Sequence, residues 1–263
     1  MDRGAQMKLK TMIKIVVTLL VAGLFSAAYA QTFDHTPFDQ ILKKYVNKKG
    51  LVDYNGIAKD PVFKAYMEAL KTAKISEMTR DGQLAFWLNA YNAVTIDKVI
   101  QWKPKKSVRE TFVPGVWTGT QFFTSREHSV AGTRLSQDDI EHEILRKQFK
   151  DPRIHFAIIC ASSSCPPLPQ WAYTEENVQR KLEEETHKYI NSSRGIKIDA
   201  ADNTLYISKL FDWFSGDFES KSGTVMDFIR LYLKKERLSF LERKPKIAYL
   251  PYDWSLNAQD PLK

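Results

Sequence analysis

The sequence predicts an α+β fold in a single domain that covers residues 31–263. Helical patterns gather toward the two ends of this region, and short hairpin-like strands lie in its middle. No serine- or glycine-rich linker divides it. We therefore expect helices packed on a mixed or antiparallel sheet, in one domain long enough to bury a large core.

Residues 1–30 have the pattern of a secretory signal peptide. Basic residues precede an apolar run, Ile15–Phe25, and Ala28 and Ala30 supply small side chains for a cleavage site. This run is too short for a transmembrane helix, and no later segment is apolar enough to form one. We expect an exported, soluble protein that begins at Gln31, is periplasmic or secreted, and is not an integral membrane protein.

The charge of the chain is mildly basic. Its net charge is +8 at pH 7, part of which belongs to the first thirty residues. Lysines occur in short clusters, and no long basic run is interleaved with aromatic residues. We therefore expect no nucleic-acid partner, and we consider a small molecule or a peptide as the candidate substrate.

Three helices are predicted in the first part of the domain. Pro37 begins the first, and Asp60 caps the second. The third, Gln83–Ile100, is apolar nearly all round and should be buried. Its Asn89 and Asn92 must find partners, since a buried unsatisfied amide costs about 1–3 kcal/mol. We expect them to tie loops to the helix; the alternative is that they face a pocket.

The middle and the end of the domain carry the strand signals. We expect strands at Phe122–Thr124 and His128–Val130, a hairpin with strands Ile196–Ile198 and Thr204–Ile207, and a last strand at Ile247–Leu250. Further helices are expected after Thr174 and over Val225–Leu233. The aromatic segment 210–214, which includes Trp213, leads to Asp217 and could wall a pocket.

A helix with a polar residue on its apolar face begins after Ser136. Ser136 and Asp139 are spaced as a capping box. At helical spacing Glu141 falls in the middle of the apolar face and His142 on its border. A carboxylate aimed at the core must be paired, hydrogen-bonded or protonated. We predict that Glu141 faces inward and is paired with a basic or amide side chain.

Both cysteines lie in one loop that follows an apolar run. Ile154–Ile159 is predicted to be a buried strand, interrupted only by His155. Cys160 continues the apolar run and is predicted to be a core residue. Cys165 lies among serines and prolines, where packing gives little reason for a thiol, so we predict that it is the functional one. A local disulfide between the two is the alternative.

Several segments together resemble one known family. They are QLAFWLNAYNAVTI, LSQDDIEHEILR, DPRIHFAIICASSSCPPL, LYISKLFDWFSGDF and YLPYDWSLN, and they cover most of residues 80–257. This combination is similar to the domain of unknown function 547 family. The positions that match its motifs are Asn89, Asn92, Glu141, His142, His155, Cys160, Cys165, Pro166, Lys209 and Asp217. The candidate binding residues are Asn89, Asn92, His155, Cys160 and Lys209, together with Trp213. The resemblance implies no activity or cofactor, and it implies a fold similar to papain-like and transglutaminase-like thiol proteins.

The first functional hypothesis is a thiol-dependent hydrolase or acyltransferase. Cys165 would be the nucleophile and His142 its base. Backbone NH groups of residues 163–165 would hold the oxyanion. Glu141 and His142 point in different directions from one helix, so Asp217 or an asparagine is an alternative partner for the histidine.

Two other classes of function remain open. One is a non-catalytic module that binds a peptide or an envelope glycan, with Trp213, Phe214, Trp171 and Tyr173 lining its groove. The other is a metal or redox site built from Cys160, Cys165, His142 and Glu141, since sulfur and imidazole ligands suit zinc, copper or iron. The metal itself is not predicted.

Overall fold

A computed structural model of the protein describes residues 32–110 and 121–262. The fold described here is that of the compact unit Thr32–Lys263. The predicted signal peptide lies outside the described residues. Within the part of the chain that is described, no helix is both long and apolar enough to cross a membrane.

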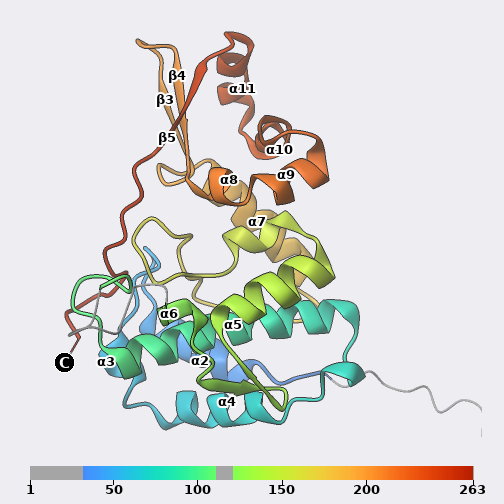
Figure 1. Cartoon of the computed structure of the whole chain (residues 1–263), viewed down its shortest axis with the longest axis vertical. Coiled ribbons are helices and arrows are strands. Elements are labelled where there is room, and N and C mark those ends of the chain that lie inside the picture. The colour runs from blue at the N-terminus through green and yellow to red at the C-terminus, as the bar shows by residue number, and fades with distance from the viewer. Residues whose placement is uncertain (1–31, 111–120, 263) are drawn as a thin grey trace, which may run out of the picture. The chain divides into compact units, whose positions relative to one another are not determined.

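The fold is α+β, as the sequence predicts. Its elements in chain order are α2 (Thr36–Tyr45), α3 (Tyr54–Ile57), α4 (Pro61–Lys71), η1 (Ile75–Glu77), α5 (Arg80–Trp102), α6 (Gln121–Thr124), β1 (His128–Val130), β2 (Thr133–Leu135), η2 (Asp139–Phe149), η3 (Pro152–Phe156), α7 (Val178–Ile190), β3 (Ile196–Asp199), β4 (Thr204–Ile207), α8 (Leu210–Trp213), α9 (Ser215–Ser222), α10 (Val225–Tyr232), α11 (Lys235–Glu242) and β5 (Lys246–Tyr249). Figure 1 shows their arrangement.

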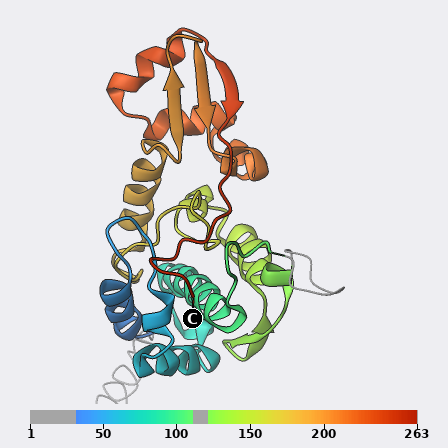
Figure 2. The ribbon, with the colours of Figure 1, turned by 90° about the vertical axis from the view of Figure 1, so that its left-hand side faces the viewer.

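The strands form two small sheets. β1 and β2 make an antiparallel hairpin, in which His128 lies opposite Leu135. The other sheet has the order β3-β4-β5, with β3 antiparallel and β5 parallel to β4. Figure 2 shows these three strands side by side. The sheet is therefore mixed, and its first two strands are the predicted hairpin.

Helix α5 is the centre of the larger hydrophobic cluster. It begins where the side chain of Thr79 accepts a hydrogen bond from the NH of Gly82, and most of its residues are buried. This cluster joins α2, α4 and α5 to η2 and the start of α7. A second cluster joins α7 to β3, β4 and α8–α11. Phe156, at the end of η3, belongs to the second cluster, while Ile158 belongs to the first, so the cysteine loop begins where the two cores meet.

Two predicted strands are helical in the structure. Phe122–Thr124 lies in the short helix α6, whose last turn is closed by the Ser125 NH on the Gln121 carbonyl at 3.1 Å. Ile154–Ile159 is not a strand, because Pro152–Phe156 forms the 3₁₀-helix η3. The Asp151 side chain accepts from the Arg153 NH and begins this turn. Hydrophobic periodicity alone cannot distinguish a strand from a helix in a short buried apolar run. The Asp-Pro pair at its start was the local signal for a helical turn.

The helix η2 begins as predicted but winds differently. The NH of Asp139 donates to Ser136 Oγ at 3.1 Å and the NH of Ser136 donates to Asp139 Oδ2 at 2.9 Å, which is the predicted capping box. The helix then continues as a π-helix to Phe149. Wide turns of this kind are rare and occur frequently at functional sites.

Candidate functional site

A small cavity lies beside the cysteine loop, between the two hydrophobic clusters. Its volume is about 80 Å³. Its lining residues come from α5, η2, η3, the cysteine loop, α8 and the C-terminal segment: Tyr91, Glu141, His155, Ile158, Cys160, Cys165, Pro166, Leu210, Trp213, Phe214, Tyr252 and Trp254. The lining is mainly apolar, so its ionisable residues lie in a poorly solvated space. Electrostatic interactions between them are stronger there than in water.

The two thiols of this cavity have the opposite burial to the one predicted. Cys165 is buried, at 4% exposure, and packs in the larger hydrophobic cluster, whereas Cys160 is half-buried. The apolar run before Cys160 ends in η3 and does not carry that residue into the core as a strand would. Cys160 is thus the more accessible thiol, so the predicted burial of the two cysteines is reversed, while a functional role for Cys165 stays a prediction.

Polar groups surround the sulfur of Cys160. Its Sγ lies 2.9 Å from Cys165 Sγ, 3.0 Å from Ser162 Oγ and 3.1 Å from the Tyr252 hydroxyl. Burial alone would raise the pKa of the Cys160 thiol, but hydrogen bonds with Cys165, Ser162 and Tyr252 outweigh it and lower this pKa. Burial raises the pKa of the Cys165 thiol, and the negative sulfur of Cys160 raises it further. Cys160 is therefore the more acidic thiol of the pair.

The cysteine loop is held by the C-terminal segment of the chain. After β5 this segment returns past the loop toward α3 (Figures 1 and 2). The NH of Ser163 donates to the Ser255 carbonyl at 2.8 Å, and the NH of Ser164 donates to the Asp253 carbonyl at 3.1 Å. The NH of Cys165 donates to the Ser162 carbonyl at 3.2 Å. The predicted oxyanion donors, the NH groups of residues 163–165, are therefore occupied, and that assignment is wrong.

The backbone is unusual directly after Cys160. Ala161 has a φ of +57°, in the left-handed region that residues with a Cβ seldom adopt. Ala161 is buried, and its carbonyl accepts from the NH of Asn257 at 3.1 Å. The C-terminal segment thus holds the turn that follows the accessible thiol.

A histidine and an aspartate form the second polar element of the cavity. His155, from η3, is 2% exposed, and its Nε2 lies 2.7 Å from Asp217 Oδ2 of α9. Arg146 of η2 donates from Nε and Nη2 to the same carboxylate, at 2.6 and 2.9 Å. The ring of His155 stacks on Phe214 at a centroid distance of 3.9 Å. The hydrogen bond to Asp217 holds one edge of the imidazole ring, and the stacked ring of Phe214 holds one face.

The electrostatics of this pair make His155 a neutral base. Burial would raise the pKa of Asp217, but hydrogen bonds from His155 and Arg146 outweigh it and hold this pKa well below its usual range. Burial lowers the pKa of His155. With Asp217 ionised, Nε2 carries the proton and donates to it, which leaves a lone pair on Nδ1. His155 Nδ1 has no hydrogen-bond partner within the described residues.

Glu141 faces inward, as predicted from its place on the helix. Its side chain is 12% exposed, and its Oε2 accepts a hydrogen bond from the Tyr91 hydroxyl at 3.2 Å. Its Oε1 lies 3.8 Å from His155 Nδ1. Burial raises the pKa of Glu141 to about 7, so the group exchanges its proton near neutral pH. It is paired with the hydroxyl of a tyrosine of α5 and lies within ion-pair distance of a basic side chain, that of His155.

His142, the predicted base, lies apart from the thiols. It is not among the residues that line the cavity. Its Nδ1 lies 2.9 Å from Arg146 Nη1, and its Nε2 lies 3.9 Å from Asp138 Oδ1 on the same helix. Burial lowers its pKa. The histidine that lines the cavity is His155, which the sequence marked as the ionisable residue of an apolar run and as a candidate binding residue, but not as the base.

The other predicted binding residues separate into structural and site residues. Asn89 exchanges two hydrogen bonds with the backbone of Tyr173, at 2.7 and 3.0 Å. Asn92 donates to the Ala157 carbonyl and accepts from the Ile159 NH, both at 3.0 Å. Both amides therefore tie loops to α5, as predicted, and Asn92 supports the start of the cysteine loop.

Lys209 and the predicted aromatic groove lie differently from our expectation. Lys209 pairs with Asp212 at 3.0 Å and is not a lining residue of the cavity. Tyr173 is buried beside Trp171, away from the thiols, whereas Trp213 and Phe214 line the cavity. Trp213 is 45% exposed. The predicted groove of four aromatic residues is therefore not formed.

A different set of aromatic residues forms the rim. The rings of Trp213, Tyr252 and Trp254 lie 4.6–5.7 Å apart, centroid to centroid. Tyr252 and Trp254 come from the closing segment of the chain, whose role in the site the sequence reasoning missed although the YLPYDWSLN motif contains both. Arg146, one helical turn after His142, was missed as well, as were Tyr91 and Ser162.

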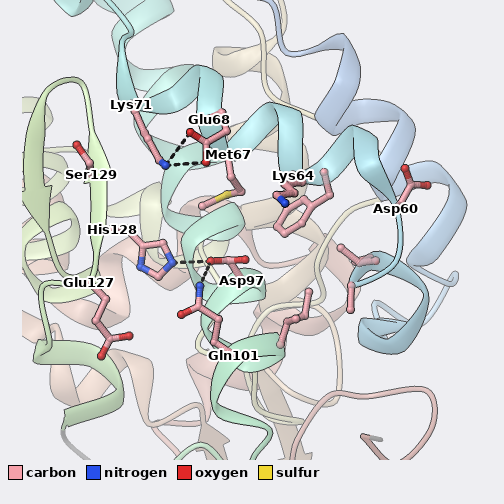
Figure 3. Close-up of a pocket in the computed structure, with 14 residues that line it drawn as sticks. Asp60, Lys64, Met67, Glu68, Lys71, Asp97, Gln101, Glu127, His128 and Ser129 are labelled. Carbon is pink, nitrogen blue, oxygen red and sulfur yellow. Dashed lines mark hydrogen bonds and ion pairs between the residues drawn. The ribbon is translucent and has the colours of Figure 1, made fainter.

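A larger cavity lies elsewhere, between α3, α4, α5 and β1, with a volume of about 350 Å³. Figure 3 shows His128 pointing toward Asp97, with Nε2 2.7 Å from Oδ2. Gln101 donates to the same carboxylate, and Lys71 pairs with Glu68 at 2.6 Å. This cavity has a histidine–aspartate pair like that of the smaller one, but no cysteine lines it.

No group of three histidine, cysteine or acidic side chains is arranged to hold a metal ion in the described ranges 32–110 and 121–262. Cys160, Cys165 and Glu141 share the cavity, but the fourth predicted ligand, His142, is engaged by Arg146 outside it. These four residues are therefore not brought together as the metal hypothesis required.

The fold and the cavity define an α+β thiol protein in which a polarised cysteine lies near an oriented histidine and a buried carboxylic acid. Residues 75–190 match the family model described as protein of unknown function, DUF547. The match confirms the family that the motifs resemble. Searches of curated proteins and of solved structures found no match. The similarity to papain-like and transglutaminase-like folds stays a prediction.

Proposed function

We propose that the protein is a thiol-dependent hydrolase or acyltransferase in which Cys160 is the nucleophile. The observation that carries this proposal is the thiol–thiol–hydroxyl cluster around Cys160 Sγ, which favours the thiolate in a cavity that also contains His155 and Glu141. The signal-peptide pattern of residues 1–30 supports action outside the cytoplasm, in a periplasmic or secreted protein.

In the proposed reaction, the Cys160 thiolate attacks the carbonyl carbon of an ester or amide and forms a tetrahedral intermediate. The Tyr252 hydroxyl, 3.1 Å from the attacking sulfur, is a donor for the developing negative charge. Collapse of the intermediate leaves a thioester on Cys160 and expels an amine or alcohol. This leaving group needs a proton, and Glu141 can supply it because its pKa is about 7.

His155 and Glu141 would then activate the second nucleophile. Water or an acceptor molecule that attacks the thioester must lose a proton, and the lone pair on His155 Nδ1 faces the Glu141 carboxyl at 3.8 Å. Asp217 orients the imidazole and stabilises its positive charge when the proton arrives. Arg146 keeps Asp217 ionised and is a positioning residue.

The test is a panel of chromogenic ester, thioester and amide substrates under reducing conditions. Wild-type protein should turn over at least one substrate through a covalent acyl adduct that mass spectrometry locates on Cys160. The Cys160→Ser variant, with its fold checked by circular dichroism, should form no adduct. Turnover that survives in Cys160→Ser, or an adduct on Cys165, would contradict the proposal.

A second candidate function is non-catalytic binding at the aromatic rim. The exposed face of Trp213 and its neighbours Tyr252 and Trp254 support it, because clustered exposed aromatic rings are typical of recognition surfaces. In that case peptides or glycans should quench tryptophan fluorescence equally in wild-type protein and in Cys160→Ser. Binding without any covalent adduct would favour this function over the enzymatic one.

A further inference from the structure

The two cysteines have the arrangement of an attacking and a resolving thiol. Cys160 Sγ and Cys165 Sγ lie 2.9 Å apart, and both cysteines are free. A disulfide bond is about 2.05 Å long, so the sulfurs need to approach by less than about 1 Å. Cys160 is half-buried and Cys165 is 4% exposed, so an external molecule reaches Cys160 first.

The loop that carries the thiols is held in place from several directions. Arg194 Nη1 donates to the Cys165 carbonyl at 3.2 Å, and the Tyr189 hydroxyl donates to the Ser164 carbonyl at 3.2 Å. The NH of Cys160 donates to Cys165 Sγ at 2.9 Å. The backbone thus keeps both sulfurs together whether or not they are bonded, which removes most of the ordering cost of closing this short loop.

From this geometry we propose that Cys160 and Cys165 carry out thiol–disulfide exchange with an external disulfide. The Cys160 thiolate attacks one sulfur of the disulfide, forms a mixed disulfide and releases the first thiolate. Cys165 gives its proton to that thiolate and attacks Cys160 Sγ, which forms the internal disulfide and expels the second thiolate. Two thiols of this chain are oxidised, and one external disulfide is reduced to two thiols.

This exchange is independent of acyl transfer, although both reactions use Cys160. It needs Cys165 as the resolving thiol, and it requires neither Glu141 nor His155. When the internal disulfide has formed, Cys160 is no longer a nucleophile, so oxidation would reversibly switch off the proposed acyl transfer. The export predicted from residues 1–30 would place the pair in a compartment where disulfides persist.

The test follows the mass of reduced, folded protein after addition of oxidised glutathione in one arm and of a peptide dimer joined by one disulfide in the other. Wild-type protein should lose two hydrogens in mass, and dithiothreitol should restore them. Cys165→Ser should stop at a mixed disulfide that carries one glutathione or one peptide. Cys160→Ser should react at least tenfold more slowly, because Cys165 is buried. A faster reaction in one arm identifies a small molecule or a polypeptide as the source of the disulfide.

Three results would overturn the proposal: wild-type protein that reacts in neither arm, wild-type protein that accumulates a stable mixed disulfide, or Cys160→Ser that reacts as fast as the wild type. Circular dichroism of each variant excludes unfolding as the cause. Ester turnover measured with dithiothreitol present reports on the acyl-transfer proposal separately. Failure of one proposal is therefore visible without failure of the other.

Discussion

Two cavities of this protein are each lined by a histidine that is paired with an aspartate, and of these two only the smaller is lined by thiols. His128–Asp97 and His155–Asp217 have the same Nε2–Oδ2 distance, 2.7 Å, and in both histidines Nδ1 has no hydrogen-bond partner within the described residues. The His128 cavity, at about 350 Å³, is the larger of the two. Neither the size of a cavity nor an oriented imidazole is therefore enough to identify a candidate active site; a nucleophile beside the imidazole is also needed.

The surroundings of the two pairs differ in the same sense. Polar and charged side chains such as Lys71, Glu68 and Glu127 stand around His128 (Figure 3). The His155 cavity is lined mainly by apolar and aromatic residues, and burial there raises the pKa of Glu141 to about 7. A poorly solvated lining shifts the pKa values of the ionisable groups within it.

The largest expected effect tests the thiol itself. Replacing Cys160 with Ser should lower the rate of acyl transfer by about a thousandfold or more, because a serine hydroxyl is not ionised near neutral pH. Single-turnover kinetics with an ester substrate would measure this. A loss of rate smaller than about tenfold would mean that Cys160 is not the nucleophile. The thiol would then not distinguish the smaller cavity from the larger one.

The next effect compares the two histidines directly. His155→Ala should slow acyl transfer by roughly 10²–10⁴-fold, the usual contribution of general acid–base catalysis. The matched variant His128→Ala removes a buried imidazole of the other pair and should leave the rate within about twofold, with any cost confined to stability. Both variants are measured under the same conditions. Equal losses of acyl-transfer rate in the two would contradict the assignment of His155 as the base.

The sequence predicted the architecture around these cavities better than it predicted the roles within them. Period and capping signals located α5, η2 and the β3–β4 hairpin, because burial stripes and turn residues act locally. The inward direction of Glu141 and the structural role of Asn89 and Asn92 followed from the same patterns. The family motifs also named Asp217 and His155 without saying what they do.

The roles of the two cysteines and the choice of histidine depend on long-range contacts. Cys160 is polarised by Tyr252, 92 positions away in the chain, and His155 is oriented by Asp217, 62 positions away. The local pattern predicted a strand that includes His155, but this segment forms η3. The chain then turns through Ala161, which is left-handed, and the burial of the two thiols is the reverse of the predicted one. No single-sequence pattern encodes such pairings.

A stability measurement tests the apolar character of the thiol cavity. The folded protein holds the Glu141 proton up to a pH of about 7, whereas the unfolded chain releases it near its usual pKa of about 4.5. The contribution to stability is therefore complete below pH 4.5 and is lost as the pH rises to about 7. Glu141→Gln lacks this loss and should gain about 1–3 kcal/mol relative to wild type between pH 5 and pH 8 in urea unfolding.

The control for this measurement is Glu143→Gln, which changes an exposed residue of the same helix. It should show no such pH-dependent gain. A stability difference between Glu141→Gln and wild type that stays constant from pH 5 to pH 8 would show that the Glu141 carboxyl is solvated.

The smallest expected effect concerns the support of the cysteine loop. Asn92→Ala removes the partner of both the Ala157 carbonyl and the Ile159 NH and should destabilise the fold by roughly 1–3 kcal/mol. Asn89→Ala, which frees the backbone of Tyr173 instead, should cost a similar amount without altering the reactivity of Cys160. Thermal unfolding and thiol titration of the two variants would separate general stability from support of the site.

The central claim is that Cys160 is the polarised, accessible thiol of the pair, and the pH dependence of alkylation tests it most directly. Reduced, folded protein is treated with iodoacetamide at pH values from 5 to 10, and the modified cysteine is located by peptide mass mapping. We predict that Cys160 reacts first, with an apparent pKa below the usual thiol value of about 8.5, and that Tyr252→Phe moves this pKa upward. Prior modification of Cys165, or an unshifted pKa for Cys160, would contradict the account.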